Sequence, residues 1–287
     1  MNTLSTKTYR DKYRLANLDR LLREALVAEK ICMVDRTGAK TIQSPYGSTP
    51  TATVQAIAGT YSISTYTTTD DTLTVTDEVI VAEHIFDFEQ TLTTLDVFAS
   101  RVDQQQFAVA HALDIYVLNN LLEAGTGTYT TPVGGFTTAA NIVEIMSNLI
   151  SKVAGYSDFY QGMYLVIENT DMVGFIQSGV ANGFNFSDAV LKNGFMDTFL
   201  GVEIYVVRTG TFTDASADST SGTTTWTNSG HRLFGIKNIS TFAAPQGVKF
   251  SEKEVSGKTG METVTFGYVG FNAWYPKRAL TIDITLA

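Results

Sequence analysis

Residues 49–91, TPTATVQAIAGTYSISTYTTTDDTLTVTDEVIVAEHIFDFEQT, contain no lysine or arginine and lead directly into a long helical pattern. Polar and apolar residues alternate twice within them, and this period of two predicts two antiparallel strands joined by a turn. The apolar positions are Val54, Ala56 and Ala58 on the outgoing strand and Leu73, Val75, Val79 and Val81 on the returning strand. The Thr, Tyr and Asp residues from Tyr66 to Thr72 predict an exposed tip.

An isolated hairpin of this kind needs cover for its apolar side. A two-stranded ribbon is marginally stable in water at best. No second hydrophobic layer lies close by in the sequence, so we expect another copy of the chain to provide the cover. The predicted contact between copies includes the seven apolar residues of the hairpin and Tyr66 at its tip.

The segment after the hairpin predicts one long helix. Thr93 or Thr94 can cap its start, and Gly125 ends it after Ala124. A helix of about 30 residues is a rod of ~45 Å. Beyond Gln106 its second side also becomes apolar, which predicts cover on more than one side. A central helix of a monomeric α/β domain has the same periodicity, so this alternative stays open.

The N-terminal 50 residues predict an amphipathic helix on an extended tether. Thr8 and Asp11 form a capping pattern. One apolar stripe then follows, formed by Leu15, Leu18, Leu22 and Leu26, and we expect it to contact a neighbouring copy. Glycines and prolines break the pattern over residues 35–50. A helix that packs locally on its own chain fits the same pattern.

The remaining residues predict a mixed α and β region. After a turn region at 125–136, the patterns predict helices at 138–154 and 170–176, buried strands at 163–167 and 201–207, and an exposed loop at 209–230. They then predict a strand at 233–235, a short helix at 238–243, and strands at 248–255, 262–274 and 279–285. The fold class expected is α+β.

Composition and motifs exclude several classes of function. The net charge of −9 over 287 residues argues against a protein that wraps nucleic acid. The charge is uneven, because residues 1–30 hold seven basic and four acidic residues while residues 51–100 hold eight acidic residues and no basic ones. The single Cys32 allows no disulfide within the chain, and no stretch is long and apolar enough to cross a membrane.

No motif predicts catalysis or a cofactor. The sequence lacks a nucleophile elbow, a phosphate-binding loop and paired cysteines. His84, His111 and His231 are widely separated and have no partners at the spacing of metal ligands. We therefore expect no enzyme, no cofactor and no metal site.

The order of these segments resembles the major capsid protein of tailed bacteriophages, whose fold is named after phage Hong Kong 97. In that comparison residues 1–50 are the N-terminal arm, 51–93 the extended β-hairpin loop, 94–130 the spine helix, 131–241 the axial α/β domain and 242–287 the peripheral β strands. Two short sequence segments add to the resemblance. They are FMDTFLGVEIYVV at Phe195–Val207 and GYVGFNAWYP at Gly267–Pro276.

The resemblance implies a structural protein of the virion. Such a protein forms pentamers and hexamers of an icosahedral shell, assembled in the host cytoplasm around double-stranded DNA that it does not read by sequence. Scaffolding, portal and decoration proteins are further candidate partners. Some members cross-link their shells through a lysine of the extended loop. The extended loop has no lysine here, so we expect contacts that are not covalent.

Three alternatives are weighed against this interpretation. An encapsulin, a nanocompartment shell protein of the same fold, carries a cargo-docking helix where this sequence predicts a tethered arm. A secreted Thr-rich adhesin or fibre protein would need an export signal, and residues 1–14 contain no apolar core of a signal peptide. An enzyme is disfavoured because no catalytic constellation is present.

Overall fold

The computed structural model describes residues 27–47, 54, 57, 67–85, 97–154, 162–182, 195–214, 226–244, 249–254, 261–274 and 280–287. Its helices are α2 (Val27–Ile31), α4 (Val97–Ala124), α5 (Ala139–Ala154) and α6 (Met172–Asn182), with a 3-10 turn η1 (Gly135–Thr137). Its strands are β1 (Met33–Asp35), β2 (Thr41–Gly47), β3 (Thr68–Thr74), β4 (Asp77–Ile85), β5 (Gly127–Thr130), β6 (Met163–Glu168), β7 (Phe195–Phe199), β8 (Val202–Val207), β9 (His231–Ile236), β10 (Ser240–Ala243), β11 (Lys249–Glu254), β12 (Met261–Ala273) and β13 (Ile282–Thr285).

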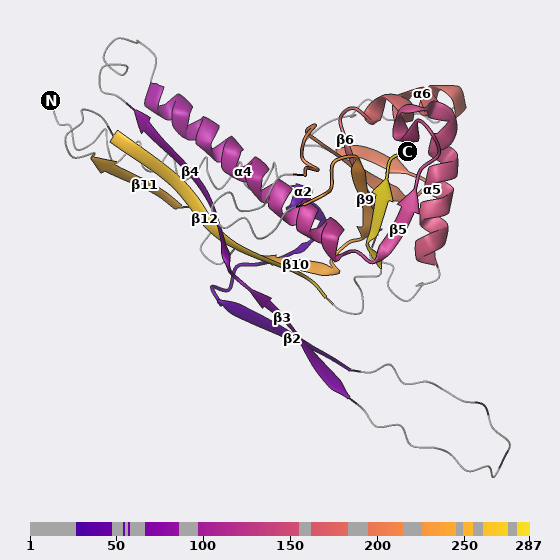
Figure 1. Cartoon of the computed structure of the whole chain (residues 1–287), viewed down its shortest axis with the longest axis horizontal. Coiled ribbons are helices and arrows are strands. Elements are labelled where there is room, and N and C mark those ends of the chain that lie inside the picture. The colour runs from indigo at the N-terminus through magenta and orange to yellow at the C-terminus, as the bar shows by residue number, and fades with distance from the viewer. Residues whose placement is uncertain are drawn as a thin grey trace.

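The spine helix α4 joins two lobes. It contains no glycine or proline over 28 residues, and it ends where the N–H of Gly125 bonds to the carbonyls of Leu121 and Leu122. Its first part lies along a sheet in which β1, β10, β12 and β11 are neighbours and β4 also pairs with β12 (Figure 1). We call this sheet the peripheral sheet. The last turns of α4 reach the second lobe, the axial lobe (Figure 1).

The two faces of the peripheral sheet differ. Along β12, Thr263, Thr265 and Val269 are completely buried. Gln105 of α4 donates to Thr263 Oγ1 at 2.8 Å and accepts from Thr265 Oγ1 at 2.9 Å, so this face lies under the helix. Side chains alternate along a strand, and the intervening residues of β12 therefore lie on the opposite, outer face.

The axial lobe is built on a sheet of described strands in the order β5-β13-β9-β6-β8-β7. Alternate residues of β6 pack in opposite directions, as in a sheet covered on both faces. Leu165 and Ile167 pack with residues of α5 and α6, whereas Tyr164 and Val166 pack with residues of α2 and α4. Gly174 of α6 makes a very close approach, because an added Cβ atom would lie 1.9 Å from the carbonyl oxygen of Phe136.

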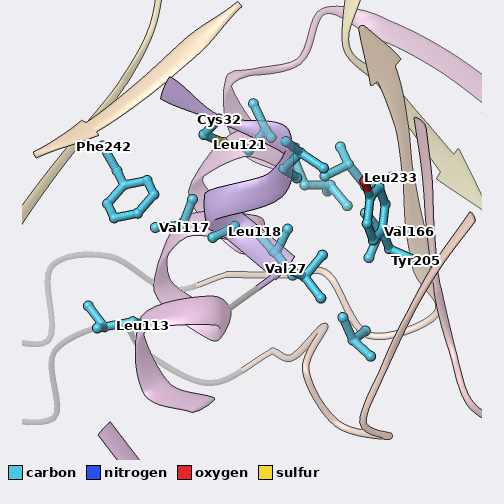
Figure 2. Close-up of a cluster of buried hydrophobic side chains, with 14 of the residues drawn as sticks. Val27, Cys32, Leu113, Val117, Leu118, Leu121, Val166, Tyr205, Leu233 and Phe242 are labelled. Atoms are coloured by element: carbon cyan, nitrogen blue, oxygen red, sulfur yellow. The ribbon is translucent and has the colours of Figure 1, made fainter. Parts of the chain in front are cut away.

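The core between the lobes centres on α2. Figure 2 shows side chains from helices and strands of both lobes converging there. They include Val27 of α2, Leu113, Val117, Leu118 and Leu121 of α4, Val166 of β6, Tyr205 of β8, Leu233 of β9 and Phe242 of β10. The short α2 helix therefore fills the space where the spine helix, the peripheral sheet and the axial sheet meet.

The structure corrects the predicted hairpin. The returning strand β3 pairs with β2, in the register Ile42 to Leu73, so the outgoing strand lies within residues expected to form the arm tether. Residues 68–72, expected at the exposed tip, belong to β3. Pro45 is tolerated inside β2 because a two-stranded ribbon needs ladder hydrogen bonds on one edge only.

The second half of the predicted returning strand belongs to a different sheet. The chain leaves the ribbon after β3, and β4 pairs with β12 over Asp77–Ile85. The alternation that predicted one continuous strand is present in both pieces, because β4 is also half-buried. The hairpin of two long strands was therefore wrong, although a ribbon does leave the molecule before the spine helix.

Two other differences arise from pairing between segments distant in sequence. Residues 240–243 form β10 between β1 and β12, where a short helix was expected. The expected peripheral strand at the C-terminus, β13, instead pairs with β5 and β9 of the axial sheet. The predicted helices α4 and α5 and the strands β6, β8, β9, β11 and β12 are confirmed within a few residues at their ends.

Candidate assembly interface

The ribbon β2–β3 projects away from both lobes and is anchored at its base (Figure 1). Leu73 is completely buried and packs with Trp274 and Ala243, and Ile42 and Val75 cover the cluster. Because a large aromatic side chain holds the base, the direction of the ribbon is set by its own chain.

Polar and backbone contacts fix the same base. Trp274 Nε1 donates to Thr241 Oγ1 at 2.8 Å, and Asn272 Nδ2 donates to Asp71 Oδ1 at 2.9 Å. At Gly270, β12 passes so close to the ribbon that an added Cβ atom would lie 2.6 Å from the carbonyl oxygen of Thr74. Only glycine permits this crossing without displacing backbone.

The connection between β2 and β3 carries exposed aliphatic side chains. Of its residues, the structure describes Val54, Ile57 and Thr67, and both Val54 and Ile57 are fully exposed to solvent. An aliphatic side chain that is fully exposed to water is about 1.5–3 kcal/mol less favourable than one that is fully buried. No residue that the structure describes covers Val54 or Ile57, so the apolar surface of both side chains is open to solvent.

The predicted contact residues divide into three groups. Val54 is exposed, as a contact between copies requires. Leu73 is buried, and Val75, Val79 and Val81 are partly buried against residues of the same chain, so these four contribute to the core of one subunit. The other predicted residues, Leu15, Leu18, Leu22, Leu26, Ala56, Ala58 and Tyr66, lie outside the described residues.

Sequence reasoning missed a second apolar surface, the outer face of the peripheral sheet. It consists of Ile80 and Ala82 of β4 with Val264, Phe266 and Tyr268 of β12. Ile80 is 55% exposed and stands directly opposite Phe266 in the strand register. The rings of Phe266 and Tyr268 are edge-to-face with centroids 6.0 Å apart. The sequence contained one signal of this surface. Ile80 is a large aliphatic residue between Val79 and Val81, so both sides of β4 carry apolar side chains at this point.

Ionisable side chains in both lobes are engaged in contacts within the chain. Tyr116 of α4 donates to Asp77 of β4, and its burial, together with this bond, raises the pKa of Tyr116. Glu203 accepts from Tyr205 Oη at 2.6 Å and from Lys237 Nζ, and the pKa of the Tyr205 hydroxyl is raised by burial and by this carboxylate. These groups support the packing, and their arrangement offers no nucleophile with a free general base.

The part of the chain that the structure describes brings together no group of three or more His, Cys, Asp or Glu residues that could hold a metal ion. Among the same residues, no helix combines the length and the apolar character needed to span a bilayer.

The lobes, the spine helix and the anchored ribbon together have the fold of phage capsid subunits. The capsid of cyanophage P-SCSP1u is similar over 92% of this chain and 89% of its own, with a TM-score of 0.69 and 13% sequence identity. A structure from Mycobacterium phage Che8 is similar over 90% of each chain, with a TM-score of 0.67 and 11% identity. The mature capsid of bacteriophage PhiM1 covers 93% of this chain and 86% of its own, with a TM-score of 0.64 and 11% identity.

These likenesses concern the fold. No family model matches the sequence, and no curated protein matches it either. The predicted α+β capsid fold is confirmed by the solved structures, which align along nearly the whole chain.

Proposed function

We propose that this chain is a structural major capsid protein, which assembles into the icosahedral shell that encloses the double-stranded DNA of a tailed phage. The observation that carries the proposal is the anchored ribbon, whose connection exposes Val54 and Ile57 completely. The phage capsid fold of the chain supports the same function. The chain acts as a building unit and not as an enzyme.

The ribbon of one copy is proposed to lie on the outer face of the peripheral sheet of its neighbour. Both surfaces are apolar, through Val54 and Ile57 of the ribbon connection and Ile80 and Tyr268 of the outer face. They belong to different parts of the subunit, because β2 and β3 carry the connection away from the lobes over strands of seven residues, or ~23 Å (Figure 1). The contact is therefore head-to-tail. Head-to-tail contacts generate rings when the rotation closes, which gives the pentamers and hexamers of a shell.

The net charge supports a shell that confines DNA without binding it by sequence. A charge of −9 provides no surplus of cations to neutralise phosphates. The proposed location is the virion, with assembly in the host cytoplasm. Scaffolding, portal or decoration proteins are proposed as additional partners that would set the shell size or its vertices.

Expression of the full chain followed by electron microscopy tests the proposal. We expect closed shells of uniform diameter, and a single monomer band after the shells are boiled in detergent, because the contacts are not covalent. Monodisperse monomers at all protein concentrations would refute the shell function. Shells that fill with a specific protein and exclude DNA would favour the encapsulin alternative.

Replacing Ile80 by glutamate should weaken assembly while leaving the subunit folded. The side chain is 55% exposed in the single chain, so its loss costs little within the subunit. In the proposed contact the exposed half of Ile80 is covered, so each contact would lose about 0.8–1.6 kcal/mol of apolar burial and would also bury an unpaired carboxylate, which costs more. The critical concentration for assembly, measured by light scattering, should rise at least about 10-fold.

The control for this change is Ile80→Val, which keeps an apolar β-branched side chain and should assemble normally. Equal critical concentrations for Ile80→Glu and Ile80→Val would remove the outer face from the proposed contact.

A further inference from the structure

The α2 segment, residues 27–35, holds the lobes together. Val27, Ala28 and Ile31 are almost completely buried in the cluster that joins α4 to the axial sheet. Figure 2 shows Val27 within this cluster. The carbonyl oxygen of Ile31 accepts the N–H of Asn238 at 2.9 Å, and β1 then pairs with β10. Undocking of this segment would open the core at the point where α4, the axial sheet and the peripheral sheet meet.

One side chain of the spine helix receives the start of α2. Asp114 accepts the N–H of Ala28 at 2.9 Å and the N–H of Val27 at 3.2 Å through its two carboxylate oxygens. These are the first N–H groups of the helix, which have no partner within it. Asp114 is 8% exposed, so a carboxyl group is buried in the apolar core beside α2.

Burial of Asp114 makes this contact sensitive to protonation. Loss of hydration raises the pKa of Asp114 from 3.8 to about 7, against the two N–H bonds and Lys30, which lower it. Glu29 adds a smaller raising effect. The charged groups that face Asp114, Glu29 and Lys30, therefore both belong to α2. Burial lowers the pKa of Lys30, and the nearby Lys237 of the axial lobe lowers it further.

Proton linkage sets the direction in which pH changes the docking of α2. A carboxyl group with a raised pKa binds a proton more tightly when α2 is docked than when α2 is released. Docking is therefore strongest below pH 3.8, weakens as the pH rises through about 7, and is weakest above that.

We propose that Asp114 and the start of α2 form a pH-dependent latch between the lobes, tightened in acid and loosened at neutral and alkaline pH. The latch belongs to the single chain and does not depend on whether the chain forms a shell. It would let the relative position of the lobes respond to the medium, because the α2 segment contacts both.

The single cysteine of the chain reports release of the segment. Cys32 follows α2 directly, is 3% exposed, and accepts a hydrogen bond from Ser240 at its sulfur. A pyridyl disulfide reagent, which reacts with thiols in acid as well as neutral solution, can label Cys32 only when the segment opens. The rate of labelling of the full chain is measured from pH 5.5 to 8, beside Asp114→Asn at each pH.

The ratio of the wild-type rate to the Asp114→Asn rate removes the intrinsic pH dependence of the thiol reaction. From a docked pKa of about 7, linkage gives a rise in this ratio of about 30-fold between pH 5.5 and pH 8. Glu123→Gln, which changes an exposed carboxylate of the same helix, should give a ratio to wild type that is constant with pH. A constant ratio for Asp114→Asn would overturn the latch.

Hydrogen exchange of the unaltered chain provides a second measurement if Asp114→Asn does not fold. After correction for intrinsic exchange, amides of residues 27–35 should lose protection between pH 5.5 and 8, while amides of α5 keep theirs. Unchanged protection of residues 27–35 over that range would overturn the latch as well.

Discussion

A subunit with Val54→Asp and Ile57→Asp should fold normally and form no shells. Both side chains are fully exposed in the single chain, so charges at these positions disturb no core of the subunit. In a shell, each copy would place two carboxylates in an apolar contact, where an unpaired charge costs several kcal/mol. The penalty recurs in every copy, so we expect complete loss of assembly at concentrations where the unaltered chain forms shells.

Sedimentation velocity and negative-stain microscopy measure the loss, and the thermal unfolding of the subunit checks its fold. The matched control exchanges the two residues, Val54→Ile with Ile57→Val, and preserves the apolar surface and its total volume. This control should assemble. Shells formed by the double aspartate variant would show that the ribbon connection makes no essential contact between copies.

The spine helix could be predicted because the residues that define it are consecutive in the sequence. Residues 97–124 contain no helix breaker, and Gly125 provides the stop. The ribbon was harder, because the period of two shows that one side of a strand is covered without showing by what. Val79 and Val81 are covered by the subunit's own core, whereas Val54 is fully exposed.

Strands whose partners are distant in sequence explain the remaining differences. The segment of β2 contains Pro45 and Gly47, which are typical of a loop, and only its pairing with β3 makes it a strand. Residues 240–243 become β10 because β1 and β12, distant in sequence, lie on either side. The outer face of the peripheral sheet depends on the register of Ile80 with Phe266, which no local pattern contains.

The axial lobe contains a buried ionic group whose disruption should have the largest effect on folding. Arg232 of β9 is 4% exposed and donates to Glu168 Oε2 at 3.1 Å and to Asp171. Glu168 also accepts the N–H of Gly210 at 2.9 Å. The loop that begins there continues to Thr211, whose carbonyl oxygen accepts from Asn119 of the spine helix at 2.8 Å. The ionic group therefore fixes a loop through which the axial lobe contacts α4.

Replacing Arg232 by methionine should reduce the free energy of unfolding by about 3–5 kcal/mol, because two carboxyl groups would remain buried without their cation. Urea unfolding followed by tryptophan fluorescence measures the change. Arg208→Met, at an exposed arginine of the same lobe, is the control and should change stability by less than about 0.5 kcal/mol.

A triple variant separates the cost of unpaired charge from the cost of lost packing. Arg232→Met combined with Glu168→Gln and Asp171→Asn removes all three charges, and neutral groups of similar size can keep hydrogen bonds such as that from Gly210. We expect it to recover more than half of the stability lost in Arg232→Met. If the triple variant is as unstable as the single one, the arginine acts through its packing on Phe212, whose ring centre lies 5.8 Å from the guanidinium carbon.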